Sequence, residues 1–147
     1  VIKDLNILVA DKSYGLLNGK KTQLKATPKL TSDFSGVQLT AADFATLLGA
    51  QYKLNGKTAT ITTDKATMTI KADSTVVEFK GEIDGSFVLT KKAYIEKGNL
   101  YFELSDSFAS SIGNIFGIEF KQYPMTGLIV VGKHNVQNIG RFAKLFS

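Results

Sequence analysis

The stretch Val37–Thr62, VQLTAADFATLLGAQYKLNGKTATIT, predicts the end of a strand, a short helix and a β-hairpin in succession. Thr40 is a good N-cap for the helix, because its hydroxyl can accept a hydrogen bond from a free backbone N–H of the first turn. Asp43 places negative charge at the positive end of the helix dipole. The apolar side chains at positions 44, 47 and 48 share one helical face, and Gly49 suits a left-handed C-cap. These signals predict a helix over Ala41–Leu48.

A β-hairpin is expected to follow the helix. The apolar positions 52 and 54 alternate with polar residues, which is typical of a strand with one buried face. Asn55-Gly56 is a strong hairpin signal, since a type I′ turn requires two residues with positive φ. The threonine-rich segment Thr58–Thr63 is then the partner strand, with Ile61 directed inward.

Similar signals lie on both sides of this stretch. Upstream they predict an entering strand through Ile7 and a hairpin around Asn18-Gly19. The second strand of that hairpin is expected over Thr22–Thr27 and to end at Pro28, which cannot donate a ladder hydrogen bond. Downstream, a second helix is expected at Asp106–Ile112, and the expected strands are Ala66–Lys71, Val76–Lys80, Ser86–Thr90, Leu100–Leu104, Gly117–Lys121 and Gly127–Val131.

The first half of the chain recurs in degenerate form in the second half. An offset of 64 residues maps Phe44 onto Phe108 and Gly49 onto Gly113, after which the second copy gains about four residues. A repeat of about 60 residues is longer than the repeats of thin solenoids. Tandem duplication of one small unit therefore fits the pattern, and chance similarity between two β-rich halves is the alternative.

We therefore expect an α+β, β-rich fold of two tandem repeats, each a small mixed sheet with one short helix, packed as one unit. The expected boundaries are 1–74 for the first repeat with the N-terminal strand, 75–133 for the second repeat, and 134–147 for a C-terminal amphipathic helix or tail. The apolar residues of Asn135–Phe146 recur at helical spacing. This segment either docks on the domain or binds a membrane surface or a partner.

The composition is that of a globular chain. With 147 residues, 44% hydrophobic and 21% charged, it is long enough and apolar enough to build a core. The absence of cysteine excludes disulfides, thiolate metal sites and a cysteine nucleophile. No apolar run approaches the ~18 residues of a membrane span. The net charge is +5, and 17 of the 18 basic residues are lysines, which favours diffuse attraction to a polyanion over specific readout of a nucleic acid.

The order of the expected elements resembles a known family. An Asn-Gly-Lys hairpin at Leu17–Lys20 precedes a strand, Pro28, a loop and a helix that ends in Leu-Gly-Ala at 48–50; an alternating strand and a threonine-rich strand follow. Over about Leu16–Val131 this order is similar to the copper amine oxidase N-terminal-like domain, also called the stalk domain. The resemblance implies a small mixed α/β module, often in tandem, of secreted or cell-wall-attached proteins of Gram-positive bacteria. It implies neither a copper site nor enzymatic activity in the module.

No motif for catalysis or cofactor binding is present. His134 is the only histidine, whereas a copper or zinc site takes several His or Cys ligands. The turn residues Asp64, Asp73 and Asp84 lack the spacing of a calcium loop. The sequence contains no nucleophile elbow, no S-x-x-K, no H-E-x-x-H and no glycine-rich phosphate loop. We therefore expect no catalytic residue, no metal and no cofactor, while a pair of hydrolase carboxylates is a tertiary property that a sequence leaves open.

Lysines recur at corresponding places in the two repeats. The candidate contacts for a polyanion are Lys20, Lys21, Lys25 and Lys29 in the first repeat and Lys91, Lys92 and Lys97 in the second. Their attraction to an anionic cell-wall polymer would be screened by salt; ordinary solvated lysines are the alternative. Tyr94, Tyr101 and Tyr123 are candidates for stacking on sugar rings, or they line the edge of the core.

Together these features predict a secreted or cell-wall-associated, non-catalytic structural or adhesion module that spaces or docks a bacterial surface protein at the cell wall. Its expected partner is a cell-wall polymer or another surface protein, and unpaired strand edges allow self-association. The alternative is a carbohydrate- or cell-wall-polymer-binding accessory domain of a wall-acting enzyme, which an exposed aromatic platform would favour. A small hydrolase, with two carboxylates facing each other in a deep cleft, is the third hypothesis.

Overall fold

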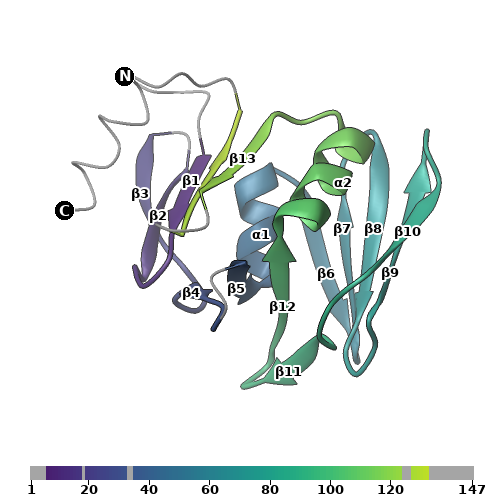
Figure 1. Cartoon of the computed structure of the whole chain (residues 1–147), viewed down its shortest axis with the longest axis horizontal. Helices are drawn as coiled ribbons and strands as arrows, with labels where there is room; N and C mark the ends of the chain where they lie inside the picture. The colour runs from purple at the N-terminus through teal and green to yellow at the C-terminus, as the bar shows by residue number, and fades with distance from the viewer. Residues whose placement is uncertain (1–5, 18, 33–34, 124–126, 133–147) are drawn as a thin grey trace.

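The computed structural model describes residues 6–17, 19–32, 35–123 and 127–132, which form two helices and three small antiparallel sheets (Figure 1). The chain is β-rich, as the strand and turn signals predict. The expectation of mixed sheets is wrong. All neighbouring strands of the described residues pair antiparallel, apart from an isolated parallel bridge between Ala72 and Ala93. Short hairpins connect most neighbouring strands, and such connections pair strands antiparallel.

Two sheets have five strands and one has four. The first five-stranded sheet has the order β13-β14-β1-β2-β3, formed by Phe120–Tyr123, Leu128–Val131, Asn6–Val9, Tyr14–Leu17 and Lys20–Gln23. The second has the order β10-β9-β8-β7-β6, formed by Gly85–Val88, Val76–Gly81, Ala66–Lys71, Thr58–Thr62 and Gln51–Asn55. The four-stranded sheet has the order β11-β12-β5-β4, formed by Tyr94–Glu96, Asn99–Ser105, Gly36–Thr40 and Lys29–Leu30.

Helix α1 (Ala41–Leu48) has the bounds and the caps that the sequence predicts. The Oγ1 of Thr40 accepts a hydrogen bond from the backbone N–H of Asp43 at 3.1 Å, and Gly49, with φ of 68°, ends the helix. The carboxylate of Asp43 is buried and accepts hydrogen bonds from the backbone N–H of Lys25 (2.9 and 3.0 Å) and of Ala26 (3.3 Å). Through Asp43, α1 therefore fixes the segment between β3 and β4.

The hairpin after α1 also forms, with a different turn. Asn55 pairs with Thr58, so Gly56 and Lys57 are the loop residues, and of these only Gly56 has positive φ (64°). The type I′ turn predicted at Asn55-Gly56 is therefore wrong, because that turn requires positive φ at both central residues. Such a pair of positive φ values, 51° and 80°, occurs instead in the turn between β11 and β12.

Helix α2 (Asp106–Phe116) is one turn longer than predicted, since it passes the expected end at Ile112. Gly113 lies inside the helix, and Gly117, with φ of 65°, forms the C-cap. Buried side chains recur at positions 108, 112 and 116, and Phe116 is 3% exposed. Burial of one aromatic side chain outweighs the ~1 kcal/mol by which glycine disfavours a helix interior.

Two strands differ from their predicted bounds for local reasons. β3 ends at Gln23, before the expected Thr27, because the N–H groups of Lys25 and Ala26 bond to the Asp43 carboxylate and not to a neighbouring strand. Pro28 thus lies outside a strand and does not end one; its carbonyl accepts a hydrogen bond from the N–H of Asp11 at 2.7 Å. The strand expected at Gly117–Lys121 starts only at position 120, because the longer helix uses Gly117 as its cap.

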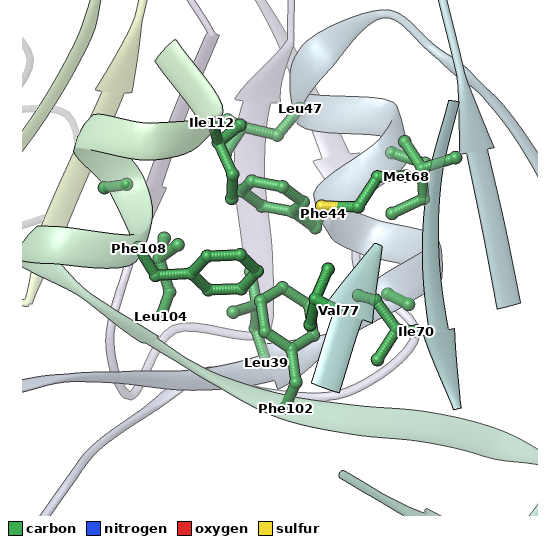
Figure 2. Close-up of a cluster of buried hydrophobic side chains, with 14 of the residues drawn as sticks. Leu39, Phe44, Leu47, Met68, Ile70, Val77, Phe102, Leu104, Phe108 and Ile112 are labelled. Atoms are coloured by element: carbon green, nitrogen blue, oxygen red, sulfur yellow. The ribbon is translucent and has the colours of Figure 1, made fainter. Parts of the chain in front are cut away.

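One core joins the two helices to the second five-stranded sheet and the four-stranded sheet, and it also takes side chains from the first five-stranded sheet (Figure 2). Phe44 of α1 and Phe108 of α2 both contact Phe102 of β12 edge to face, with ring centroids 5.4 Å and 5.8 Å apart. β1 is buried on both faces, since Leu8 belongs to this main core and Ile7 to a smaller cluster. The main core therefore takes side chains from both halves of the chain.

The two five-stranded sheets have corresponding strand orders. In the second sheet, strands β6 to β10 lie side by side in the order of the sequence. In the first sheet, the equivalent places from one edge to the other are taken by β13, β14, β1, β2 and β3. The pairing of β1 with β14 connects the start of the described chain to its end. A backbone hydrogen bond also corresponds: Asp11 and Asp73, with φ of 68° and 64°, donate to Pro28 and Ala93 at 2.7 and 2.8 Å. Each five-stranded sheet thus combines strands from both halves.

Candidate binding face on the four-stranded sheet

The four-stranded sheet has one face in the core and one open face. Alternate residues of β5 and β12 are buried in the core: Val37, Leu39, Leu100, Phe102 and Leu104. The residues between them point the opposite way, because successive side chains of a strand alternate between faces. These outward residues include Gln38, Tyr101 and Glu103, all half-buried. We call the open side of this sheet, with Tyr94 of β11, the binding face.

Two tyrosines stack on the binding face. Tyr94 lies opposite Tyr101 in the β11–β12 pair, and the two rings are nearly parallel, with centroids 5.2 Å apart and an interplanar angle of 11°. Burial raises the pKa of the Tyr94 phenol, the charges of Glu96 and Glu103 raise it further, and a hydrogen bond with Gln38 acts in the opposite direction. At neutral pH the Tyr94 hydroxyl is therefore protonated and can donate a hydrogen bond.

A pocket of about 160 Å³ adjoins the tyrosine pair. Glu103 connects the two, because it lines the pocket and lies two residues from Tyr101 on the same face of β12. Its carboxylate, on a side chain 21% exposed, lies 3.7 Å from the Nζ of Lys91. Hydroxyl groups dominate the rest of the lining, with one apolar wall; these residues are Thr31, Ser32, Ser35, Thr90 and Ser105, and Phe87 and Leu89.

Close packing of β5 on β12 builds the rim of this pocket. A Cβ at Gly36 would collide with the carbonyl oxygen of Leu104, so only glycine fits there. The N–H of Gly36 donates to the Oγ1 of Thr31 at 3.2 Å, and the N–H of Thr31 donates to the carbonyl of Gly36 at 3.1 Å. The Oγ of Ser105 accepts from the N–H of Phe108 at 3.2 Å, as the N-cap of α2. The position of these hydroxyls is thus set by the backbone.

The structure does not gather the candidate lysines onto one face. All seven are exposed, namely Lys20, Lys21, Lys25, Lys29, Lys91, Lys92 and Lys97. Lys20 and Lys21 lie on β3 of the first sheet, where the Nζ of Lys21 is 4.2 Å from the centroid of the Tyr14 ring. Lys29 lies on β4, an edge strand of the four-stranded sheet, whereas the Nζ of Lys91 lies 3.7 Å from the carboxylate of Glu103 on the central strand β12.

Sequence reasoning gave Tyr94 and Tyr101 as candidates, but it gave neither Gln38 and Glu103 nor the pocket. Alternation along β12 places Glu103 on the face of Tyr101, and the turn dipeptide Lys97-Gly98 could have paired the two tyrosines. Gln38 lies opposite Glu103 only through the β5–β12 pairing, which has no local signal. Tyr123, the third tyrosine candidate, packs at the edge of the smaller cluster around Ile7.

Three further points concern membrane helices, metal clusters and the C-terminal segment. Within the described ranges, no helix is both long and apolar enough to cross a membrane. In the same ranges, no group of three or more His, Asp or Glu side chains is arranged to hold a metal ion. His134 and the predicted helix at Asn135–Phe146 lie outside the described residues.

Comparison of the chain with models of protein families, with curated proteins and with solved structures gave no match.

Proposed function

We propose that this protein is a non-catalytic module of a secreted bacterial surface protein, and that it docks that protein on a cell-wall glycan through the binding face. The stacked pair of Tyr94 and Tyr101 on an open sheet face is the observation that carries this proposal. A pyranose ring has an apolar C–H face and a rim of hydroxyls. Tyrosine offers a flat apolar surface with a polar tip, and Gln38 and Glu103 beside the pair offer hydrogen-bond partners.

The size of the pocket favours a polymer over a small free ligand. At about 160 Å³ it is smaller than the ~300–1,000 Å³ of a typical small-molecule site. It therefore fits one substituent or one sugar edge, with the rest of the chain lying across the tyrosines.

The carboxylates of the binding face support a non-catalytic role. Glu96 lies opposite Asn99, four residues from Glu103 along the sheet, which is about 13 Å at the rise of a strand. Glycoside hydrolysis usually needs two carboxyl groups about 5–10 Å apart. Glu103 is, in addition, paired with Lys91.

We further propose that the two halves are tandem copies of one small unit, similar to the stalk domain. The corresponding strand orders of the two five-stranded sheets support this proposal. The matched hydrogen bonds from Asp11 and Asp73 support it independently. In such an arrangement the four-stranded sheet, whose centre pairs β5 with β12, lies where the two copies meet.

The test is retention of the full chain on purified Gram-positive cell walls, with and without teichoic acids, at low and high salt. We expect retention on the bare glycan at both salt concentrations. Truncation of an aromatic anchor commonly lowers affinity by 10-fold or more, so Tyr101→Ala and Tyr94→Ala should each weaken retention by about that factor. The matched control is Thr60→Ala with Thr69→Ala, a cross-strand pair in the second sheet with half-buried side chains, which should leave retention unchanged.

Three outcomes would contradict glycan binding at this face. Equal retention of Tyr101→Ala and the unmodified chain would show that the tyrosine pair does not bind the glycan. Retention that needs teichoic acids and disappears at high salt would assign binding to the exposed lysines. No retention under any condition would leave a spacer or a protein-docking module.

A further inference from the structure

The two outer hairpins, β2–β3 and β9–β10, give the five-stranded sheets edges of opposite character. β3 has the sequence Lys-Lys-Thr-Gln, and its two lysines are exposed. β10 has the sequence Gly-Ser-Phe-Val and carries no charge. Lysines on an edge strand oppose pairing with another chain, because they would be forced against its backbone. The edge at β10 lacks this protection.

Exposed apolar side chains gather at the same hairpin. Among the described residues, four large apolar side chains are exposed, and three of them, Val76, Ile83 and Val88, belong to β9, β10 and the turn between them. Val76 and Val88 lie opposite each other, and Val88 is 67% exposed. Figure 1 shows β10 at the outer margin of its sheet. The hairpin thus combines an unprotected edge with an apolar surface.

The free backbone groups of β10 can be identified from its pairing with β9. The N–H of Leu89 donates to the carbonyl of Thr75 at 2.7 Å, in continuation of the β9–β10 register. Hydrogen-bonded and non-hydrogen-bonded pairs alternate along an antiparallel ladder. Positions 85, 87 and 89 therefore direct their backbone groups toward β9, whereas Ser86 and Val88 direct theirs toward the open edge. Two residues at this edge thus offer two donors and two acceptors.

We propose that β10 pairs antiparallel with β10 of a second copy of this chain, so that two five-stranded sheets join into one continuous sheet. A two-fold axis at Phe87 sets Ser86 of each copy opposite Val88 of the other. The free N–H and C=O groups of both residues then form four hydrogen bonds across the axis, and the interface is self-complementary. The exposed Val88 side chains are covered in the same step.

The charges at the ends of β10 favour a second copy as the occupant. In this register the acidic turn Glu82–Asp84 of one copy lies at the same end of the paired strands as the basic segment Thr90–Lys92 of the other. The ion pair that Glu82 makes with Lys65, at 3.9 Å, is well exposed and is readily exchanged. Self-pairing of β3 would instead bring Lys20, Lys21 and Lys25 together, in a segment without an acidic residue. Opposite charges meet at the β10 edge, although each copy carries a net charge of +5.

Sedimentation of the full chain from micromolar to millimolar concentration tests this pairing. An interface built on one short strand is small, so we expect a dimer with a dissociation constant on the order of 10⁻⁴ M. Val88→Lys should weaken dimerisation at least 10-fold, because it sets a charge on the pairing edge. The matched control is Gln23→Lys, at the corresponding position before Leu24 on β3, and it should leave the dimer intact. A monomer up to 1 mM, or an equal effect of both variants, would overturn the proposal.

Cross-linking tests the register and does not depend on the lysine variant. The chain has no cysteine, so Ser86→Cys with Val88→Cys supplies the only thiols. A hydrogen-bonded antiparallel pair has Cα atoms about 5.5 Å apart, which a disulfide can bridge. We expect this double variant to form covalent dimers at least 10-fold faster than Ser86→Cys alone or than Lys21→Cys with Gln23→Cys. Equal rates in the three variants would overturn the register.

Discussion

The two helices occupy corresponding places in the core but are attached to their surroundings in different ways. In α1, Asp43 reaches out of the helix and binds the backbone of Lys25 and Ala26. In α2, the residue 64 positions later is Ser107, which is exposed and contacts the Oγ of Ser105 at 3.2 Å. α2 has instead an additional turn, which buries Phe116. A buried carboxylate orders the neighbouring loop in one half, and apolar burial anchors the helix in the other.

The comparison extends to the edges of the sheets. Phe44 of α1 and Phe108 of α2 are both fully buried, and each helix has a hydroxyl N-cap and a glycine C-cap, whereas the edge strands β3 and β10 differ in charge. The core limits which side chains fit, because interiors are close-packed. An edge strand is free of that limit. The features on which the proposed dimer depends are therefore those in which the halves differ.

Removal of the corresponding core phenylalanines should have the largest effect. Phe44 and Phe108 are both 0% exposed, and a buried Phe→Ala change typically lowers stability by about 3–5 kcal/mol. We expect Phe44→Ala and Phe108→Ala to lower the free energy of unfolding within that range and within about 1 kcal/mol of each other. Phe87 is half-buried and stacks on Phe108 with ring centroids 4.6 Å apart. Phe87→Ala should therefore lower the free energy of unfolding by less. Urea unfolding followed by circular dichroism measures the three values.

The correspondence between the helices would be wrong if Phe44→Ala or Phe108→Ala lowered the free energy of unfolding by no more than Phe87→Ala does. The midpoint and the slope of each unfolding curve must be compared together, because a changed slope reports a changed denatured or native state.

Removal of the Asp43 carboxylate, which attaches α1 to the segment between β3 and β4, should have the second-largest effect on stability. Asp43→Ala leaves the N–H groups of Lys25 and Ala26 without their carboxylate acceptor, and hydrogen bonds to charged groups contribute about 1.5–3 kcal/mol. We expect a loss of about 2–3 kcal/mol, together with faster amide hydrogen exchange at these two residues. Ser107→Ala should change stability by less than about 0.5 kcal/mol, as exposed substitutions usually do. Unchanged exchange at Lys25 and Ala26 in Asp43→Ala would show that another group holds this loop.

Local signals were sufficient for the elements in which neighbouring residues determine the conformation. Thr40, Asp43 and Gly49 mark both ends of α1, because caps act on groups within one turn. The same kind of signal predicted a wrong end for α2, because Gly113 was expected as its C-cap by analogy with Gly49. There the periodic burial of positions 108, 112 and 116 decides the length, and that periodicity was available in the sequence.

Pairings between distant strands could not be predicted, and the binding face depends on them. β1 pairs with β14 and β5 pairs with β12 without any connecting turn that would fix the register. The lysines were chosen for their charge and their recurrence along the sequence, yet Lys20 and Lys21 lie on the first five-stranded sheet and Lys29 lies on the four-stranded sheet. Tyr101 and Glu103 were predictable as neighbours by alternation, whereas Gln38 reaches them only across the central pair.

The smallest expected effect is on the dependence of stability on pH. It concerns two tyrosines with raised pKa values, Tyr52 in the first half and Tyr94 on the binding face. Burial alone raises the pKa of Tyr52, whereas Tyr94 is also affected by the charges of Glu96 and Glu103. A pKa raised in the folded state adds stability that is fully present below the unfolded value near 10 and is lost as the pH rises through the folded value. Tyr52→Phe and Tyr94→Phe should therefore each make the loss of stability above about pH 10 shallower. Glu103→Gln should lower the pKa of Tyr94 in a spectrophotometric titration and leave that of Tyr52 unchanged, since its charge acts only on the binding face. An equal shift of both phenols would mean that the carboxylate acts through the fold as a whole and that the binding face is not a local electrostatic unit.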